Sequence, residues 1–231
     1  MCEETGCTRR HVLGILATGA LALTARGSAW ASPQTSDVTP DQAMAMLKEG
    51  NQRFVSRTMT HPNVSVARQA ETVSGGQHPF ATILSCSDSR VPVELLFDRG
   101  IGDLFVLRVA GNVVGEDEVS TIEYGTGHLG TPLMVVMGHT KCGAVTAVVN
   151  GAKLHGHLPH LADHIKPAAD RAKAGGATGD TLVMDAIREN VREGIQLILK
   201  ECDGVKAMVD AGKLKVVGAV YHLETGKVEW I

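Results

Sequence analysis

Two thiols and one imidazole stand at places in the chain where a metal ion could bind. Cys86 directly follows an apolar run of strand length, and His139 and Cys142 follow a second such run. Thiolate and imidazole groups are natural zinc ligands, and three protein ligands leave a fourth position for water. A pair of buried structural cysteines beside a hydrogen-bonded histidine would have the same spacing, so spacing alone favours neither interpretation.

Asp88 and Arg90 favour the metal site over the structural alternative. The acid lies two residues after Cys86 and the arginine two residues further on, so the two side chains can form a carboxylate–guanidinium pair beside the metal. The arginine would keep the carboxylate ionised and oriented. The carboxylate could then accept a hydrogen bond from a zinc-bound hydroxide, or itself occupy the fourth zinc position. Without a metal nearby, such a pair is more often a surface ion pair.

Buried strands are expected to bring these residues together. The apolar runs lack polar alternation, which is typical of strands covered on both faces. They occupy residues 80–85, 104–109, 133–138 and 216–222, and an antiparallel edge strand follows at 227–231. Helical patterns occupy residues 40–54, 93–97, 119–129, 144–149 and 181–200, with a weaker one between Pro62 and Gly75. We predict an α/β fold with a mostly parallel central sheet flanked by helices. Such sheets carry their sites at the carboxyl ends of the strands.

The amino-acid composition excludes several classes of protein. The chain has 231 residues, of which 44% are hydrophobic, a formal net charge of −3 and five cysteines. A nucleic-acid-binding protein would normally carry a basic surplus, so nucleic acid is not an expected partner. Five scattered cysteines are too few for a disulfide scaffold, and their odd number suggests that at least one acts alone or binds a metal. These properties leave a soluble enzyme or a binding domain.

The N-terminal residues have the pattern of an export signal. Arg9 and Arg10 precede an apolar stretch over residues 12–25, too short to span a bilayer, and a small-x-small cleavage motif follows. The paired arginines resemble a twin-arginine signal, which exports folded proteins. We therefore predict an export signal over residues 1–31, a single catalytic domain over residues 32–231 and a periplasmic location. An uncleaved membrane anchor or a misassigned start is the alternative.

The segments that contain the candidate ligands belong to a set of four motifs. In chain order they are Cys-Ser-Asp-Ser-Arg-Val-Pro at 86–92, Arg-Val-Ala-Gly-Asn at 108–112, Ile-Glu-Tyr at 122–124 and Gly-His-Thr-Lys-Cys-Gly-Ala-Val at 138–145. Together and in this order they resemble the β-class carbonic anhydrases. The resemblance extends from about Pro40 to the C terminus and implies one zinc ion per chain on the two cysteines and the histidine, with Asp88 and Arg90 as the catalytic dyad.

The same resemblance implies a substrate pocket at a subunit interface. Gln77 matches a glutamine that hydrogen-bonds substrate at the dimer interface of the family, and Phe105 and Tyr124 match positions that line its CO2 pocket. Gly143 would let the backbone come close to the metal site. A homodimer or a higher homo-oligomer is therefore expected. Ordinary packing or surface roles are the alternative for Gln77, Phe105 and Tyr124.

The implied activity is that of a zinc lyase that hydrates CO2 reversibly to bicarbonate and a proton. Zinc lowers the pKa of its bound water toward about 7, and Asp88 would orient the resulting hydroxide for attack on CO2. Two alternatives keep the fold: a zinc hydrolase acting on COS or CS2, and a non-catalytic descendant that binds zinc or bicarbonate. Nucleotide binding is disfavoured, because Cys86 stands where a glycine-rich loop would follow the first strand. The expected partners are CO2 and bicarbonate, without nucleic acid and without a membrane in the mature form.

Some members of the family have a second, inhibitory bicarbonate pocket built around a tryptophan, an arginine and a tyrosine. Arg108 and Tyr221 match the last two positions, but Ile83 stands at the tryptophan position. We therefore expect the open form, in which water takes the fourth zinc position and Asp88 pairs with Arg90.

Two further features stand apart from this site. His155, His157, His160 and His164 form a dense patch that could collect a second metal or relay protons, but we expect an exposed loop and helix start without a ligand role. Cys202 is expected to be a small buried apolar residue.

Overall fold

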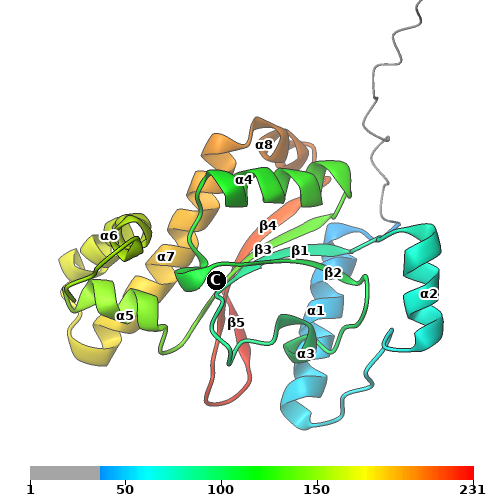
Figure 1. The fold of residues 1–231 in the computed structure, drawn as a ribbon, viewed down its shortest axis with the longest axis horizontal. Coiled ribbons are helices and arrows are strands. Elements are labelled where there is room, and N and C mark those ends of the chain that lie inside the picture. The colour runs from blue at the N-terminus through cyan, green and yellow to red at the C-terminus, as the bar shows by residue number, and fades with distance from the viewer. Residues whose placement is uncertain (1–36) are drawn as a thin grey trace, which may run out of the picture. The chain divides into compact units, whose positions relative to one another are not determined.

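The computed structural model describes residues 37–231, which form a five-stranded sheet with helices on both faces (Figure 1). The strand order is β2-β1-β3-β4-β5. The strands are β1 (Ala81–Ser85), β2 (Leu104–Arg108), β3 (Leu133–His139), β4 (Lys215–Tyr221) and β5 (Val228–Trp230). The first four pair in parallel, and β5 pairs antiparallel to β4. The predicted α/β class, with its antiparallel edge strand, is confirmed.

The helices of residues 37–231 mostly lie where the sequence predicts them. They are α1 (Pro40–Ser56), α2 (Val66–Gly75), α3 (Val93–Leu96), α4 (Glu116–Glu123), α5 (Gly143–Val149), α6 (Leu158–Ala174), α7 (Gly179–Glu201) and α8 (Asp203–Asp210). The sequence does not predict α8. It predicts only the start of α6, and Pro167 interrupts the helical pattern inside this helix. In this part of the chain, no helix is both long and apolar enough to cross a membrane.

The start of α1 follows from local side-chain chemistry. The Thr39 hydroxyl accepts from the Gln42 amide, and the Gln42 side chain accepts from the Thr39 amide. This capping box satisfies backbone donors that the first turn of a helix leaves free. Pro40 occupies the first helical position, where no backbone donor is needed. The helix then buries Ala43 and Leu47 against the sheet.

The two faces of the sheet bury different residues of the same strands, because successive side chains of a strand point to opposite sides. On one face, Ile83 and Val135 pack with α1 and α3. On the other face, Leu84 and Val136 pack with α4, α7 and α8. Because both faces of the sheet are buried, the strands are continuous apolar runs in the sequence.

A third apolar cluster lies at the carboxyl end of the sheet. It contains residues from α5, α6 and α7, together with Val113, Val220 of β4, Cys86 and Cys142. The two thiols therefore lie in apolar surroundings, although they belong to loops that follow strands. This cluster is the part of the core that positions the candidate site.

Helix α2 differs from the other helices because it buries none of its residues. Val66 and Val73 are 83% and 82% exposed. Arg68 connects the helix to the rest of the molecule by donating to the Ile101 carbonyl oxygen at 2.9 Å. In Figure 1 the helix lies at the outer edge of the molecule. It thus presents apolar side chains that no other part of residues 37–231 covers.

Candidate metal centre

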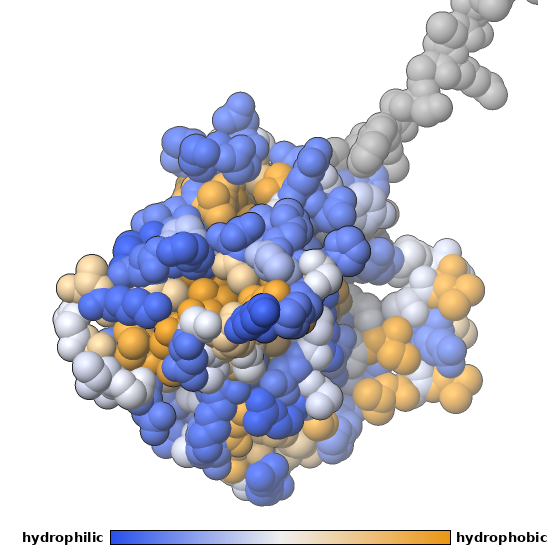
Figure 2. Space-filling view, turned by 60° about the vertical axis from the view of Figure 1, so that its left-hand side comes forward, coloured by the Kyte–Doolittle hydropathy of each residue, from blue (hydrophilic) through white to orange (hydrophobic). Residues whose placement is uncertain are grey.

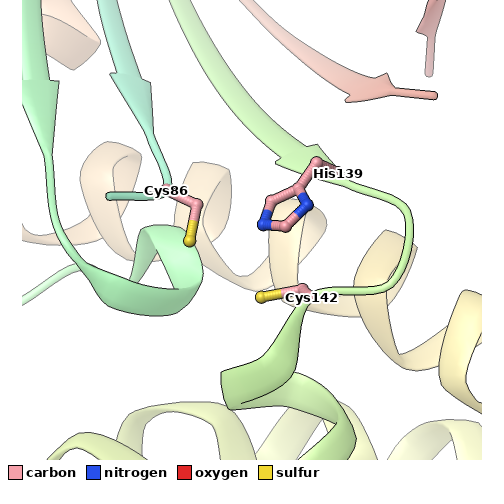
Figure 3. Close-up of side chains that lie close together, drawn as sticks. All are labelled: Cys86, His139 and Cys142. Carbon is pink, nitrogen blue, oxygen red and sulfur yellow. The ribbon is translucent and has the colours of Figure 1, made fainter. Parts of the chain in front are cut away.

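Cys86, His139 and Cys142 come together at the carboxyl ends of two neighbouring strands. Cys86 follows β1, His139 is the last residue of β3 and Cys142 is the cap residue of α5. Because β1 and β3 pair in parallel, with Ser85 opposite Met137, their ends lie side by side. One potential ligand atom from each residue lies within 4.8 Å of the other two. Figure 3 shows the three side chains turned toward a common point.

His139 presents a free ring nitrogen inside this cluster. Its Nδ1 lies 2.9 Å from the Thr140 carbonyl oxygen, which can only accept a hydrogen bond, so Nδ1 carries the proton. The side chain is fully buried, and Nε2 has no hydrogen-bond partner. A buried polar atom without a partner costs free energy, and a metal ion would satisfy it. The tautomer is therefore the one that binds a metal through Nε2.

The two thiols differ in acidity because they interact with each other. The hydrogen bond from Cys142 lowers the pKa of Cys86 to about 4, although burial opposes this shift. The same hydrogen bond, together with burial, raises the pKa of Cys142. The pair thus carries one negative charge, and thiolate is the form that binds a metal. A donor set of two sulfurs and one imidazole nitrogen fits zinc.

Gly111 supports the Cys86 thiolate from a short 3-10 helix (Ala110–Asn112) that the sequence interpretation did not assign to the site. Its amide donates to Cys86 Sγ at 3.2 Å, and its carbonyl oxygen accepts from Asn190 Nδ2 at 2.8 Å. Glycine is required here, because φ is +68° and a Cβ would lie 2.8 Å from Ile165 Cδ1. The glycine lies in the motif at 108–112, which was its only signal in the sequence. Asn190 of α7 had no such signal.

Asp88 and Arg90 form the pair that the sequence predicts. Arg90 Nε lies 2.9 Å from Asp88 Oδ1 and its terminal nitrogen lies 2.7 Å from Oδ2. These hydrogen bonds, with one from the Arg90 amide, hold the pKa of Asp88 well below its usual range, although desolvation opposes the shift. Asp88 Oδ2 also lies 3.8 Å from His139 Nε2. An ionised carboxylate therefore lies at the edge of the donor set.

Arg108 orients the loop that carries Cys86 and Asp88. Its guanidinium group donates to the carbonyl oxygens of Cys86 at 3.2 Å and of Asp88 at 2.6 Å. Tyr221, which the sequence pairs with Arg108 in a possible bicarbonate pocket, is 5% exposed, and Ile83 is fully buried. In this structure Arg108 supports the backbone of the loop.

A family model described as carbonic anhydrase matches residues 81–228 of the chain. The chain is also 36% identical, over 193 residues, to carbonic anhydrase 2 of Mycobacterium tuberculosis; the match covers 83% of this chain and 92% of that protein. This chain belongs to the carbonic anhydrase family.

Solved structures extend the match to the β class of carbonic anhydrases. The β-carbonic anhydrase CafA of Aspergillus fumigatus superimposes with a TM-score of 0.65 at 28% identity, covering 83% of this chain and 89% of that one. A β-carbonic anhydrase from the ascomycete Sordaria macrospora has the same fold, with a TM-score of 0.66 at 24% identity over 72% of this chain and 87% of that one. The class that the motifs predict is confirmed. Residues 1–31, where an export signal is predicted, lie outside the described residues.

In this member of the carbonic anhydrase family, the donor set is not close to the residues predicted to line the CO2 pocket in the same chain. Phe105 and Tyr124 contact each other, with ring centroids 5.8 Å apart. Phe105 pairs with Thr82, four residues before Cys86, which is about 13 Å along a strand. Gln77 is exposed and precedes β1 at its amino end. Their roles in substrate binding stay predictions.

Gly143, in contrast, lies at the donor set, directly after Cys142. A Cβ at this position would meet no atom within 4 Å, so the space beside it is open. An apolar cavity of about 250 Å³ lies against Gly143 and Ala144, between α5 and α6. Figure 2 shows apolar side chains gathered on this face of the molecule. A small apolar molecule can therefore approach the loop that carries Cys142.

The histidine patch before and in α6 and the remaining cysteine, Cys202, lie in surroundings of the kind that the sequence predicts. His155, His157 and His160 are exposed before and within the first turn of α6, and the His160 ring contacts that of His164, at 5.1 Å between centroids. Among residues 37–231, the candidate ligands described above form the only cluster of three or more side chains able to hold a metal. Cys202 is fully buried, and burial raises its pKa to about 11.

Proposed function

We propose that this chain is a zinc-dependent carbonic anhydrase that converts CO2 and water reversibly to bicarbonate and a proton. The observation that carries the proposal is the buried donor set of Cys86, His139 and Cys142 beside the ionised Asp88–Arg90 pair. Membership of the carbonic anhydrase family supports the same activity. One zinc ion per chain would supply a Lewis acid that makes water nucleophilic near neutral pH.

Asp88 would orient the nucleophile. Its Oδ2 lies 3.8 Å from His139 Nε2, so the carboxylate faces the space in front of the donor set. Because Arg90 keeps it ionised, Asp88 can only accept a hydrogen bond there. It would hold the hydrogen of the attacking water and leave an oxygen lone pair directed at CO2. Arg90 acts through Asp88, which it holds with two hydrogen bonds.

We also propose that the active protein is a homodimer or a higher homo-oligomer. The strand register places Phe105 too far along β2 to serve the donor set of its own chain, and Tyr124 contacts Phe105. They and Gln77 would instead line the CO2 site of a neighbouring subunit. The exposed valines of α2 also favour a subunit contact, since exposed apolar patches are typical of interfaces.

The proposal is tested by stopped-flow measurement of CO2 hydration together with the zinc content of the purified protein. We expect about one zinc per chain, loss of hydration after treatment with a chelator, and recovery on adding zinc. Full activity of the metal-free protein would contradict the zinc assignment. Hydrolysis of COS and CS2 is measured on the same preparation, and faster turnover of either than of CO2 would make the chain a hydrolase.

Export by a twin-arginine pathway is proposed from the sequence of residues 1–31 alone. The protein recovered from the periplasm should begin at or near Ser32, because the predicted cleavage motif ends at the residue before it. An N-terminal sequence that starts at Met1 in that fraction would contradict cleavage.

A further inference from the structure

The loop between β3 and α5 carries a candidate ligand at each end and contains only Thr140 and Lys141. Lys141 has a left-handed backbone conformation, with φ of 55°, which a residue with a Cβ adopts only where surrounding contacts stabilise it. A loop this short transmits its own movement directly to His139 and Cys142. Contacts that hold the loop therefore affect the geometry of the donor set.

Thr140 makes three hydrogen bonds to the last residue of β4 and the turn that follows it. Its amide donates to the Tyr221 carbonyl oxygen at 2.9 Å. Its hydroxyl lies 3.0 Å from the Leu223 amide nitrogen and 2.9 Å from Glu224 Oε2. An amide can only donate and an ionised carboxylate can only accept, so the hydroxyl accepts from Leu223 and donates to Glu224. Thr140 is buried, and losing Glu224 would leave the O–H donor of this hydroxyl without an acceptor, which costs free energy.

The peptide of Thr140 in turn determines the state of His139. The Thr140 carbonyl oxygen accepts the Nδ1 proton at 2.9 Å, which leaves Nε2 as the bare nitrogen of the ring. If this peptide rotated, the proton could move to Nε2, and a protonated Nε2 cannot bind a metal. The orientation of one backbone carbonyl group thus decides whether His139 is a competent ligand.

We propose that Glu224 is a positioning residue for the metal centre. By holding the Thr140 hydroxyl, it keeps the Thr140 carbonyl group on Nδ1 of His139 and leaves Nε2 free for the metal; we call the Glu224–Thr140 hydrogen bond the clamp. The inference rests on the proposed function, in which this site holds zinc. Lys141 Nζ also lies 3.0 Å from Glu224 Oε1, but these side chains are 69% and 45% exposed, and such ion pairs contribute little.

The test uses variants that break the clamp and matched variants that keep it. Glu224→Ala and Thr140→Val remove the hydrogen bond, whereas Glu224→Gln and Thr140→Ser retain an acceptor and a hydroxyl. Lys141→Met is the control, because it removes only the ion pair. The first readout is the rate at which a chelator removes zinc from the holoprotein. Loss of an outer partner of a ligand typically costs 10–100-fold in metal affinity, so we expect zinc loss to be about 10–100-fold faster in the clamp-breaking variants and near the wild-type rate in the other three.

The second readout is the tautomer of His139, measured from imidazole ¹⁵N chemical shifts in the metal-free full chain. We expect the Nδ1–H form in the wild type and in Lys141→Met, and a mixture of both forms in Glu224→Ala. If Glu224→Ala does not fold, as judged by its melting curve, the comparison of Thr140→Val with Thr140→Ser carries the test.

The outcomes separate this inference from the proposed function. A wild-type chain that binds no zinc would refute the proposed function, while the ¹⁵N shifts would still test the clamp. Wild-type zinc loss in both clamp-breaking variants would overturn the clamp, and so would an unchanged tautomer in Glu224→Ala. Equal acceleration in Lys141→Met and Glu224→Ala would also overturn it, because the ion pair would then explain the effect.

Discussion

Asp88 shows how one side chain determines the charge of another. A carboxylate near two sulfurs that share a negative charge would ordinarily be disfavoured as an anion. The bidentate guanidinium of Arg90 reverses this and lowers the pKa of Asp88. At neutral pH the group is therefore an acceptor, with no proton of its own to donate. Its proposed role in orienting the attacking water depends on this property.

Replacing Asp88 by asparagine tests that role. Asp88→Asn has nearly the same shape but loses the charge, and its amide can donate where the carboxylate only accepts. Misplacing a reacting group can cost about 10²-fold in rate, so we expect kcat for CO2 hydration to fall by about that factor, with zinc content unchanged. Asp163→Asn, an exposed acid on α6, is the control. A variant with full zinc and full activity would remove Asp88 from the mechanism.

At the scale of elements, Asp98 joins the connection between α1 and α2 to the end of α3. It accepts from Arg53 Nε at 2.6 Å, from the amide and hydroxyl of Thr60 at 3.0 Å each, and from the His61 amide at 2.9 Å. Burial alone would raise the pKa of Asp98, but these hydrogen bonds outweigh burial and hold the pKa below its ordinary value of 3.8. The carboxylate thus fixes the segment that leads to α2.

The lowered pKa of Asp98 makes part of the stability depend on pH. A group with a depressed folded pKa stabilises the fold above its unfolded value, near 4, and this contribution is lost as the pH falls below that value. We expect Asp98→Asn to lower the free energy of unfolding by roughly 1–3 kcal/mol at pH 7, and by less at pH 3. Urea unfolding of both proteins at the two pH values measures this difference. A difference that grows as the pH falls would contradict the assignment.

The helices show where a local sequence pattern is enough to predict an element and where it is not. α1 is predictable because its cap, its first-position proline and its apolar stripe are all local. The end of α4 is less predictable. The sequence predicts one helix over residues 119–129, but the structure has a π-helical turn at Tyr124–His128. Within that turn, a Cβ on Gly125 would lie 2.5 Å from Thr82 Oγ1 and 2.8 Å from the Phe105 ring. The close approach of this turn to β1 and β2 is a tertiary contact, which no periodicity within the segment reveals.

At the scale of the whole molecule, the donor set and the residues proposed to line the CO2 site lie in different parts of one chain. The predicted CO2-lining residues lie toward the amino half of the sheet, and the ligands lie at its carboxyl end. α2 leaves its valines exposed at the outer edge. Both features are accounted for if a second copy of the chain completes each site.

Introducing charges on the apolar surface of α2 tests the assembly. In the double variant Val66→Asp/Val73→Lys, each new charge lies at the helix end where it favours the helix dipole, so the helix should persist. We expect sedimentation analysis to show a shift from oligomer to monomer, with reduced CO2 hydration and unchanged zinc content. Ala67→Asp places an acid in the same turn on a different face and serves as the control. A double variant with wild-type mass in solution would exclude α2 from the interface.

The donor types, their place after strands and the Asp88–Arg90 pair were all predictable from the sequence. Each depends on residue identity and on patterns that extend over a few neighbouring positions. Apolar runs locate buried strands, and parallel pairing brings the ends of those strands to one edge of the sheet. The α/β fold and the Cys86–His139–Cys142 cluster follow from these local rules.

Only the tertiary structure decides the chemical state of those residues. The tautomer of His139 depends on how the Thr140 peptide is held, and Glu224, which holds it, lies 84 positions away in the sequence. The thiolate of Cys86 likewise accepts from the Gly111 amide, 25 positions away. Protonation and orientation depend on which distant groups packing brings within hydrogen-bond distance. Local sequence patterns carry no information about such contacts, so these properties emerge only once the chain has folded.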